Sequence, residues 1–215
     1  MRLAVFDCDG TLVDGQAAVC DAMETAFAEA GLSRPDRNAI RRIVGLSLPQ
    51  AVRVLAPDVD TARQAAAVDA YKTAFRHARA TGALEEPLYA GLRDVLEHLS
   101  ASGWILAVAT GKSDRGLTAC LAGHGIDHLF GPLQTADRHP SKPDPAMLDA
   151  AMHEAGAAPT DTVMIGDTSF DMAMARAAGV RAIGVAWGYH AADELREAGA
   201  EAVAATPAEL KDLLA

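Results

Sequence analysis

The fold of this chain is decided by the stretch Leu3-Ala4-Val5-Phe6-Asp7-Cys8-Asp9-Gly10-Thr11-Leu12-Val13-Asp14. Its first four residues are apolar and have the length of a strand that is buried on both faces, as in a parallel sheet. Side chains at i and i+2 of an extended chain point the same way. We therefore expect Asp7 and Asp9 to direct two carboxylates into one space, where their repulsion requires a cation, a shared proton or both.

The composition excludes several classes of protein. The 215 residues carry a net charge of −10, which disfavours binding to nucleic acid or to an anionic membrane surface. No apolar run approaches the length that spans a bilayer, and the N-terminus does not read as a signal peptide. The three cysteines are odd in number and widely spaced, which is typical of a reducing compartment. We expect a cytoplasmic protein that is a monomer or a homodimer.

The region directly after the first strand is expected to be all helical. Residues 15–83 are rich in Ala, and their apolar residues recur at helical spacing. The clearest helices are predicted at about Leu48–Leu55 and Thr61–Ala80. Two short connections would join this inserted domain to a main domain of residues 1–14 and 84–215, an arrangement suited to hinge motion.

From Gly91 onward, apolar runs alternate with helical patterns. This alternation predicts an α/β fold with a doubly wound parallel sheet. The expected strands are Trp104–Ala109, Thr162–Ile165, Val180–Val185 and Ala202–Ala204, and a partly extended segment lies between residues 126 and 135.

Reactive side chains follow these strands, where open parallel sheets bind their ligands. The segments are Thr110-Gly111-Lys112, Gly166-Asp167-Thr168-Ser169-Phe170-Asp171 and Arg138-His139-Pro140-Ser141-Lys142-Pro143-Asp144-Pro145. The four-residue spacing of Asp167 and Asp171 at the start of an expected helix would place them on one face. The alternative for this pair is helix capping on a solvated face.

A metal site explains the acidic residues better than capping does. Asp7, Asp9, Asp167 and Asp171 would bring four negative charges together, and oxygen ligands suit a hard cation, of which Mg²⁺ is the expected one. Lys142 and Mg²⁺ would return three positive charges, so one proton on Asp9 would make the site neutral.

These segments, in this order, resemble the four motifs of the haloacid dehalogenase superfamily of phosphohydrolases. The resemblance covers the whole chain, and the helical insertion is similar to the cap of the phosphoglycolate phosphatase branch. It implies that Asp7 is the nucleophile, that Asp9 is the general acid and base, and that Lys142 neutralises developing charge. Thr110 and the backbone N–H of Gly111 would bind phosphoryl oxygens. Mg²⁺ would be bound by Asp7, Asp9 through its carbonyl, Asp167 and Asp171.

The substrate implied by the resemblance is a small phosphorylated metabolite, similar to phosphoglycolate. Gly45 lies in the helix break expected to face the site, and Arg53, on the helix that follows, is a candidate for a second anionic group. The alternative for Arg53 is a solvated helix face. A sugar phosphomutase of the β-phosphoglucomutase type remains open, although Leu48 stands where such enzymes tend to have arginine. A pyrophosphatase and a non-enzymatic protein that binds phosphorylated ligands also remain open.

Overall fold

The computed structural model describes all 215 residues, and its centre is a six-stranded sheet in the order β3-β2-β1-β4-β5-β6. Every pair of neighbouring strands is parallel. The strands are β1 (Arg2–Phe6), β2 (Trp104–Thr110), β3 (Phe130–Thr135), β4 (Thr162–Gly166), β5 (Arg181–Val185) and β6 (Ala202–Ala204). The order reverses beside β1, which is the switch point where such sheets bind ligands. The predicted α/β fold with a doubly wound parallel sheet is confirmed.

Alternation along β1 divides the core of the main domain into two layers. Ala4 and Phe6 belong to one buried cluster, and Leu3 and Val5 belong to another on the opposite face. Side chains of α5 (Leu92–Ala101), α6 (Asp114–Gly123) and α10 (Pro207–Leu213) contribute to the first cluster. Those of α7 (Ala146–Ala155), α8 (Ser169–Ala177) and α9 (Ala192–Ala198) contribute to the second. Each large apolar side chain buried in these layers contributes about 1.5–3 kcal/mol.

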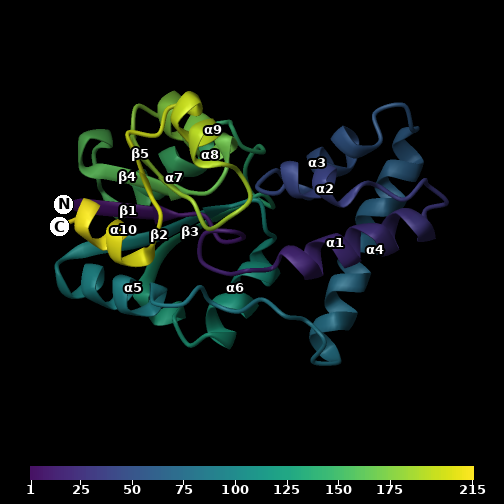
Figure 1. Cartoon of the computed structure of the whole chain (residues 1–215), viewed down its shortest axis with the longest axis horizontal. Helices are drawn as coiled ribbons and strands as arrows, with labels where there is room; N and C mark the ends of the chain where they lie inside the picture. Colours follow the sequence, from purple (N-terminus) through teal and green to yellow (C-terminus); the bar gives the residue numbers. More distant parts are fainter.

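Four helices form a separate unit between β1 and α5. They are α1 (Gln16–Glu29), α2 (Arg37–Arg42), α3 (Leu48–Leu55) and α4 (Thr61–Ala80). The predicted helices over residues 48–55 and 61–80 are confirmed. The unit has its own apolar cluster, which includes Met23, Phe27, Ile40 and Val52. Figure 1 shows these helices at one end of the molecule and both termini at the other.

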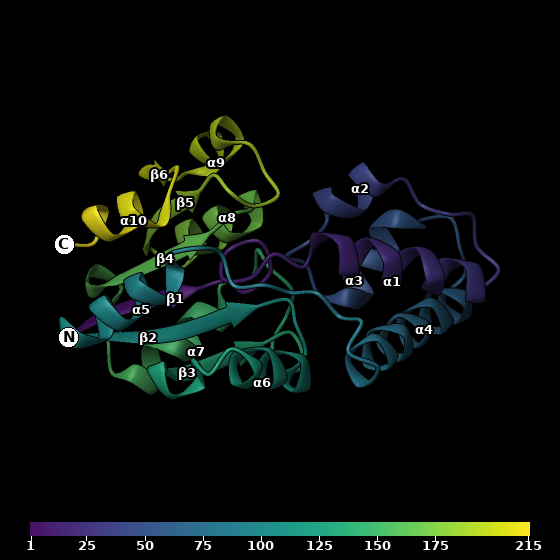
Figure 2. The same cartoon turned by 60° about the horizontal axis from the view of Figure 1, so that its bottom comes forward.

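The two connections to this helical unit run side by side. The N–H of Asp14 donates to the carbonyl of Pro87 at 2.8 Å, and the N–H of Tyr89 donates to the carbonyl of Leu12 at 3.1 Å. The main body and the helical unit are therefore joined through one narrow, hydrogen-bonded neck. In Figure 2 the arrow of β2 points toward the helical unit, which lies beyond the carboxyl ends of the strands. No helix is both long and apolar enough to cross a membrane.

Candidate active site

Three carboxylates meet where β1 and β4 end. Asp7, Asp167 and Asp171 each offer one oxygen, and these oxygens lie within 4.8 Å of one another. All three side chains are fully buried. Because β1 and β4 are paired from Leu3 to Phe6, residues that follow the two strands emerge next to each other. The parallel register of the sheet thus creates the cluster.

Asp167 is fixed by two donors from other segments. Its Oδ1 accepts a hydrogen bond from the Thr11 hydroxyl at 2.7 Å, and its Oδ2 accepts one from the N–H of Tyr189 at 2.9 Å. Gly10 has a φ of 83°, and a Cβ there would lie 2.2 Å from Asp167 Oδ2. Only glycine therefore lets the turn after β1 pass this carboxylate.

Asp171 lies in the first turn of α8, whereas Asp167 lies before the helix. Thr168 is the N-cap of α8, and Asp171 completes a capping box by accepting from the N–H and hydroxyl of Thr168 at 3.0 and 2.7 Å. The prediction that Asp167 and Asp171 share one helix face is therefore wrong. Asp167 lies before the cap because β4 extends to Gly166 and the helix starts only at Ser169.

Lys142 joins the nucleophile candidate to the helix cap. Its Nζ lies 3.0 Å from Asp7 Oδ1 and 2.6 Å from Asp171 Oδ1, and its side chain is completely buried. Burial opposes the charge on Lys142, but Asp171 and Asp7 outweigh that effect and raise its pKa above the ordinary value. The lysine therefore stays charged beside the three aspartates.

The remaining charge of the cluster is unbalanced, which suits a cation. Burial raises the pKa of Asp7 to about 7, although Lys142 works in the opposite direction. Burial, followed by repulsion from Asp171 and Asp7, raises the pKa of Asp167 well above its usual range. The Oδ2 atom of Asp7 is buried without any hydrogen-bond partner. A buried, unpartnered oxygen in an all-carboxylate set matches the donor chemistry of Mg²⁺.

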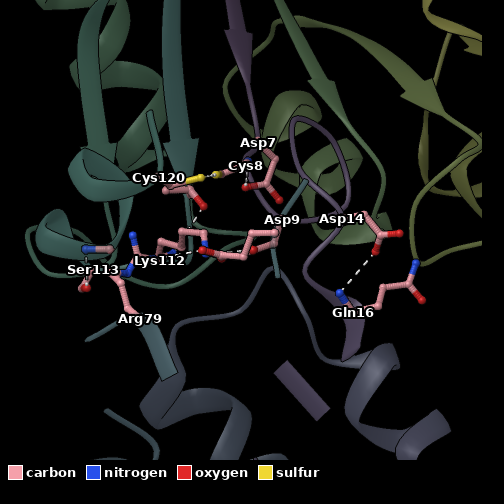
Figure 3. Close-up of polar contacts among 12 residues, drawn as sticks. Asp7, Cys8, Asp9, Asp14, Gln16, Arg79, Lys112, Ser113 and Cys120 are labelled. Atoms are coloured by element: carbon pink, nitrogen blue, oxygen red, sulfur yellow. Dashed lines mark hydrogen bonds and ion pairs between the residues drawn. The ribbon is translucent and has the colours of Figure 1, made fainter. Parts of the chain in front are cut away.

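The side chain of Asp9 lies apart from this cluster. Its Oδ1 is 3.0 Å from Lys112 Nζ, and Figure 3 shows the two side chains pointing toward each other. The i, i+2 argument predicted that Asp7 and Asp9 direct their carboxylates into one space. Both residues do line one cleft, but the Asp9 carboxylate pairs with Lys112 instead of joining the oxygens around Asp7. The reason is that β1 ends at Phe6, so both aspartates lie in the following turn instead of on a strand.

A cleft of about 680 Å³ separates the strand ends from the helical unit. Asp7, Asp9, Thr110 and Gly111 line it from the main body. The helical unit contributes the apolar residues Met23, Val44 and Leu46 and the cationic residues Lys72, Arg76 and Arg79. Lys142, Asp167 and Asp171 are not themselves among the lining residues but lie next to Asp7, which is.

The loop between α2 and α3 closes directly over Gly111. A Cβ on Gly111 would lie 2.5 Å from the carbonyl oxygen of Leu46 and 2.8 Å from that of Gly45. The N–H of Ser47 also donates to the Ser141 hydroxyl at 2.8 Å, next to Lys142. Gly45 therefore faces the site, and the contact leaves no room for a side chain at Gly111.

Arg53 does not reach the cleft. It is exposed on α3 and is absent from the cleft lining, because the helix turns Ala51 and Val52 inward. Its substrate-binding role is therefore not supported by its position.

Sequence reasoning did not assign roles to Thr11, Lys112 or Glu86. Thr11 contacts Asp167, Lys112 contacts Asp9, and Glu86 contacts Lys112. Thr11 and Lys112 stand inside the quoted motif segments, so their position was a usable signal. No local pattern marks Glu86, which is buried in the second connection.

Comparisons with known proteins agree with this arrangement. A family model described as "Haloacid dehalogenase-like hydrolase" matches residues 4–185. A "Probable phosphatase IndB" from Dickeya dadantii is 38% identical over 214 residues, which cover 97% of this chain and 91% of the relative. A "Phosphoglycolate phosphatase" from Pseudomonas putida is 33% identical and is matched over 88% of this chain and 71% of its own length.

Solved structures agree as well. A predicted phosphatase from Clostridium acetobutylicum superposes with a TM-score of 0.89 at 25% identity, over 99% of this chain and 97% of its own. A haloacid dehalogenase-like family hydrolase from Streptococcus pneumoniae superposes with a TM-score of 0.86 at 27% identity, over 100% of this chain and 99% of its own. These findings confirm the predicted family and the prediction of a phosphoric monoester hydrolase. The chain belongs to the haloacid dehalogenase-like hydrolase family.

Proposed function

We propose that this enzyme is a Mg²⁺-dependent phosphatase that hydrolyses a small phosphomonoester through an aspartyl-phosphate on Asp7. The observation that carries the proposal is the environment of Asp7. One of its oxygens is paired with Lys142 at 3.0 Å, and the other is buried and unpartnered among carboxylates. A nucleophilic carboxylate needs this combination of a fixed orientation and a free oxygen.

The metal would be held by Asp7, Asp167 and the backbone carbonyl of Asp9. When bound, Mg²⁺ would neutralise charge on the phosphoryl group, so that an anionic ester can approach an acidic site. Asp171 was predicted as a further ligand, but its Oδ1 lies 2.6 Å from the Lys142 ammonium group, which would repel a cation there, whereas the hydrogen-bond partners of Asp167 are neutral. We assign Asp171 instead to orienting Lys142, with any contact to the metal made through water.

The first half-reaction transfers the phosphoryl group to the enzyme. An oxygen of Asp7 attacks phosphorus, and the bond between phosphorus and the ester oxygen breaks in line with that attack. Asp9 donates its proton to the departing oxygen, which leaves as an alcohol. Thr110, the N–H of Gly111 and Lys142 stabilise the charge on the phosphoryl oxygens.

The second half-reaction returns the enzyme to its starting state. A water molecule gives one proton to the Asp9 carboxylate and attacks phosphorus. The bond between phosphorus and the Asp7 oxygen then breaks, so that inorganic phosphate and a free Asp7 carboxylate are formed. Asp9 ends the cycle protonated, ready for the next ester.

We propose that residues 15–83 act as a cap that selects the substrate, and that residues 1–14 and 84–215 perform the chemistry. The cationic side chains Lys72 and Arg76 line the cap side of the cleft without an ion-pair partner and suit an ester with a second negative group. A carboxylated ester similar to phosphoglycolate fits this chemistry and the names of several relatives. Three buried, unpaired cysteines support a cytoplasmic location.

The proposal is tested by phosphate release from a panel of esters, with Mg²⁺ and with a chelator. The panel contains 2-phosphoglycolate, β-glucose 1-phosphate, pyrophosphate and 4-nitrophenyl phosphate. We expect metal-dependent release, with 2-phosphoglycolate among the best substrates. Conversion of β-glucose 1-phosphate to its 6-phosphate without release would instead indicate a mutase. Equal rates with and without divalent metal would contradict the proposal.

A further inference from the structure

A second charged cluster lies beside the catalytic one, at the neck of the molecule. It consists of Asp9, Arg79, Glu86 and Lys112, and we call it the neck cluster. Its members come from the turn after β1, from the end of α4, from the second connection and from the loop after β2. It therefore links the main body, the helical unit and the segment that joins them.

Lys112 is the centre of this cluster. Its Nζ lies 2.5 Å from Glu86 Oε1 and 3.0 Å from Asp9 Oδ1, and only 8% of its side chain is exposed. The ring of Phe75 lies over the same ammonium group, 5.3 Å from ring centroid to Nζ. A lysine that is buried among two carboxylates and an aromatic face has little rotational freedom, unlike a lysine on an open surface.

Glu86 is fixed from three directions, so it can hold Lys112 in place. Its Oε2 accepts from Arg79 at 2.9 Å, while its Oε1 faces Lys112. Its backbone carbonyl lies 2.8 Å from His124 Nε2 and accepts from that ring. Only 6% of the Glu86 side chain is exposed. The position of the Lys112 ammonium group therefore depends on how Glu86 is held at the neck.

Each of the two buried lysines contacts a different one of the two aspartates to which the proposed mechanism gives a catalytic role. Lys142 contacts Asp7 and Asp171 and belongs to the carboxylate cluster at the ends of β1 and β4. Lys112 contacts Asp9, and the Asp9 carboxylate is not among the oxygens that gather around Asp7. The ion pair with Lys112 is the polar contact that fixes the direction of the Asp9 carboxylate, since Asp9 Oδ1 is buried and has no hydrogen-bond partner.

We propose that Lys112, held by Glu86, is a positioning residue that aims Asp9 at the leaving-group oxygen. The inference rests on the proposed function, because it assigns Asp9 the role of general acid. Arg79, at the end of α4, connects Glu86 to the helical unit. The direction of the Asp9 side chain therefore depends on an intact neck cluster. The bond changes are those of the first half-reaction, and Lys112 exchanges no proton in it.

The test compares esters that need a proton on the leaving oxygen with esters that do not. The series consists of alkyl and aryl phosphates whose alkyl or aryl groups carry no charge. The basicity of the leaving oxygen increases stepwise from 2,4-dinitrophenyl phosphate to ethyl phosphate. The measured quantity is kcat/KM, which reports the steps up to release of the alcohol. Its logarithm is plotted against the pKa of the leaving alcohol.

We expect a steeper negative slope for Lys112→Met and Glu86→Gln than for the unmodified enzyme, similar to that of Asp9→Asn. General acid catalysis is worth ~10²–10⁴-fold, so the loss in kcat/KM should approach ~100-fold for ethyl phosphate and stay below ~10-fold for the dinitrophenyl ester. Lys112→Arg should restore part of the lost selectivity, because it keeps a charged donor near Asp9. The matched control is Lys211→Met, which makes the same change at an exposed lysine on α10 that forms no ion pair, and it should leave the slope unchanged.

An equal loss for all esters in Lys112→Met and Glu86→Gln would overturn the inference, because it would indicate a structural or substrate-binding role. An unchanged slope would overturn it as well. Glu86→Gln serves where Lys112→Met fails to fold, as judged by its melting temperature. Metal-dependent turnover of the series by the unmodified enzyme would leave the proposed function standing in either case. Loss of the inference is therefore distinguishable from loss of the function.

Discussion

The two walls of the cleft differ in how firmly their charged side chains are held. On the main-body side, Asp7, Asp171 and Lys142 are buried and contact one another at hydrogen-bonding distances. On the cap side, Lys72 and Arg76 are exposed and form no ion pair. Exposed long side chains keep their rotational freedom, which they lose only when a ligand binds. This difference supports the proposal that the residues at the strand ends perform the chemistry and that the side chains which select the substrate become ordered only when it binds.

The largest effect is expected for Asp7→Asn. The change removes the attacking carboxylate, so kcat should fall by ~10³-fold or more with every ester. It also removes one of several buried negative charges, so the melting temperature should not fall. Phosphate release and thermal unfolding of the same preparation check both expectations.

Full activity in Asp7→Asn would contradict the assignment of the chemistry to the main-body wall, since another group would then have to attack phosphorus. A matched control is Asp69→Asn, which changes a carboxylate on the cap wall of the same cleft. We expect this control to alter KM with some substrates but to leave kcat within ~10-fold of its starting value.

A smaller effect is expected for Gly111→Ala, which tests the contact between the walls. The added methyl group would lie 2.5 Å from the Leu46 carbonyl and would push the loop between α2 and α3 away from the site. Overpacking of this kind typically costs 1–3 kcal/mol, and displacement of the loop should lower kcat/KM by about 10-fold. Steady-state kinetics measure the loss.

Gly123→Ala is the control for that substitution. Gly123 ends α6, and a Cβ there meets nothing within 4 Å. Alanine favours a helix over glycine by up to about 1 kcal/mol, so this variant should be at least as stable as the parent and equally active. If Gly111→Ala behaves in the same way, the loop does not control access to the site.

The smallest effect is expected for Arg42→Ala. Arg42 on α2 pairs with Glu194 on α9 at 2.6 Å, and this ion pair joins the two parts of the molecule on their exposed surface. The Arg42 hydrogen bond lowers the pKa of Glu194 from 4.5 to about 2. A lowered folded-state pKa means that the pair stabilises the fold above about pH 4.5 and that this contribution disappears as the pH falls toward 2.

The melting temperatures of the parent and Arg42→Ala should therefore differ slightly near neutral pH and converge in acid. High salt should also reduce the difference, because exposed ion pairs are screened. A difference that is independent of pH and salt would show that Arg42 stabilises the fold in another way.

Local patterns predicted the elements and the strand-end motifs well. The apolar run before Asp7 and the helical spacing over Thr61–Ala80 follow from periodicity alone, and the structure has both elements. The position of Asp167 could not be read in this way, because four-residue spacing does not reveal where the helix begins. Thr168 caps α8, and this places Asp167 in the preceding turn.

The features of the site that sequence patterns did not predict depend on contacts between distant segments. Glu86 and Lys112 are 26 positions apart and Thr11 and Asp167 are 156 apart, so no local spacing records either pair. The charge of Arg53 and its place on α3 favour a substrate-binding role, but the inward face of α3 is set by packing around Val52. Side-chain direction at the cleft thus depends on tertiary packing, which the sequence pattern alone does not specify.

The most direct test of the central claim is a rapid-mixing measurement on Asp9→Asn with 4-nitrophenyl phosphate. Its leaving group needs little help from an acid, whereas hydrolysis of the aspartyl-phosphate needs the base that this variant lacks. We predict a burst of about one equivalent of 4-nitrophenol per active site, followed by slow turnover, with phosphate bound to the peptide that contains Asp7. Turnover with neither a burst nor phosphate on that peptide would contradict the assignment of Asp7 as the nucleophile.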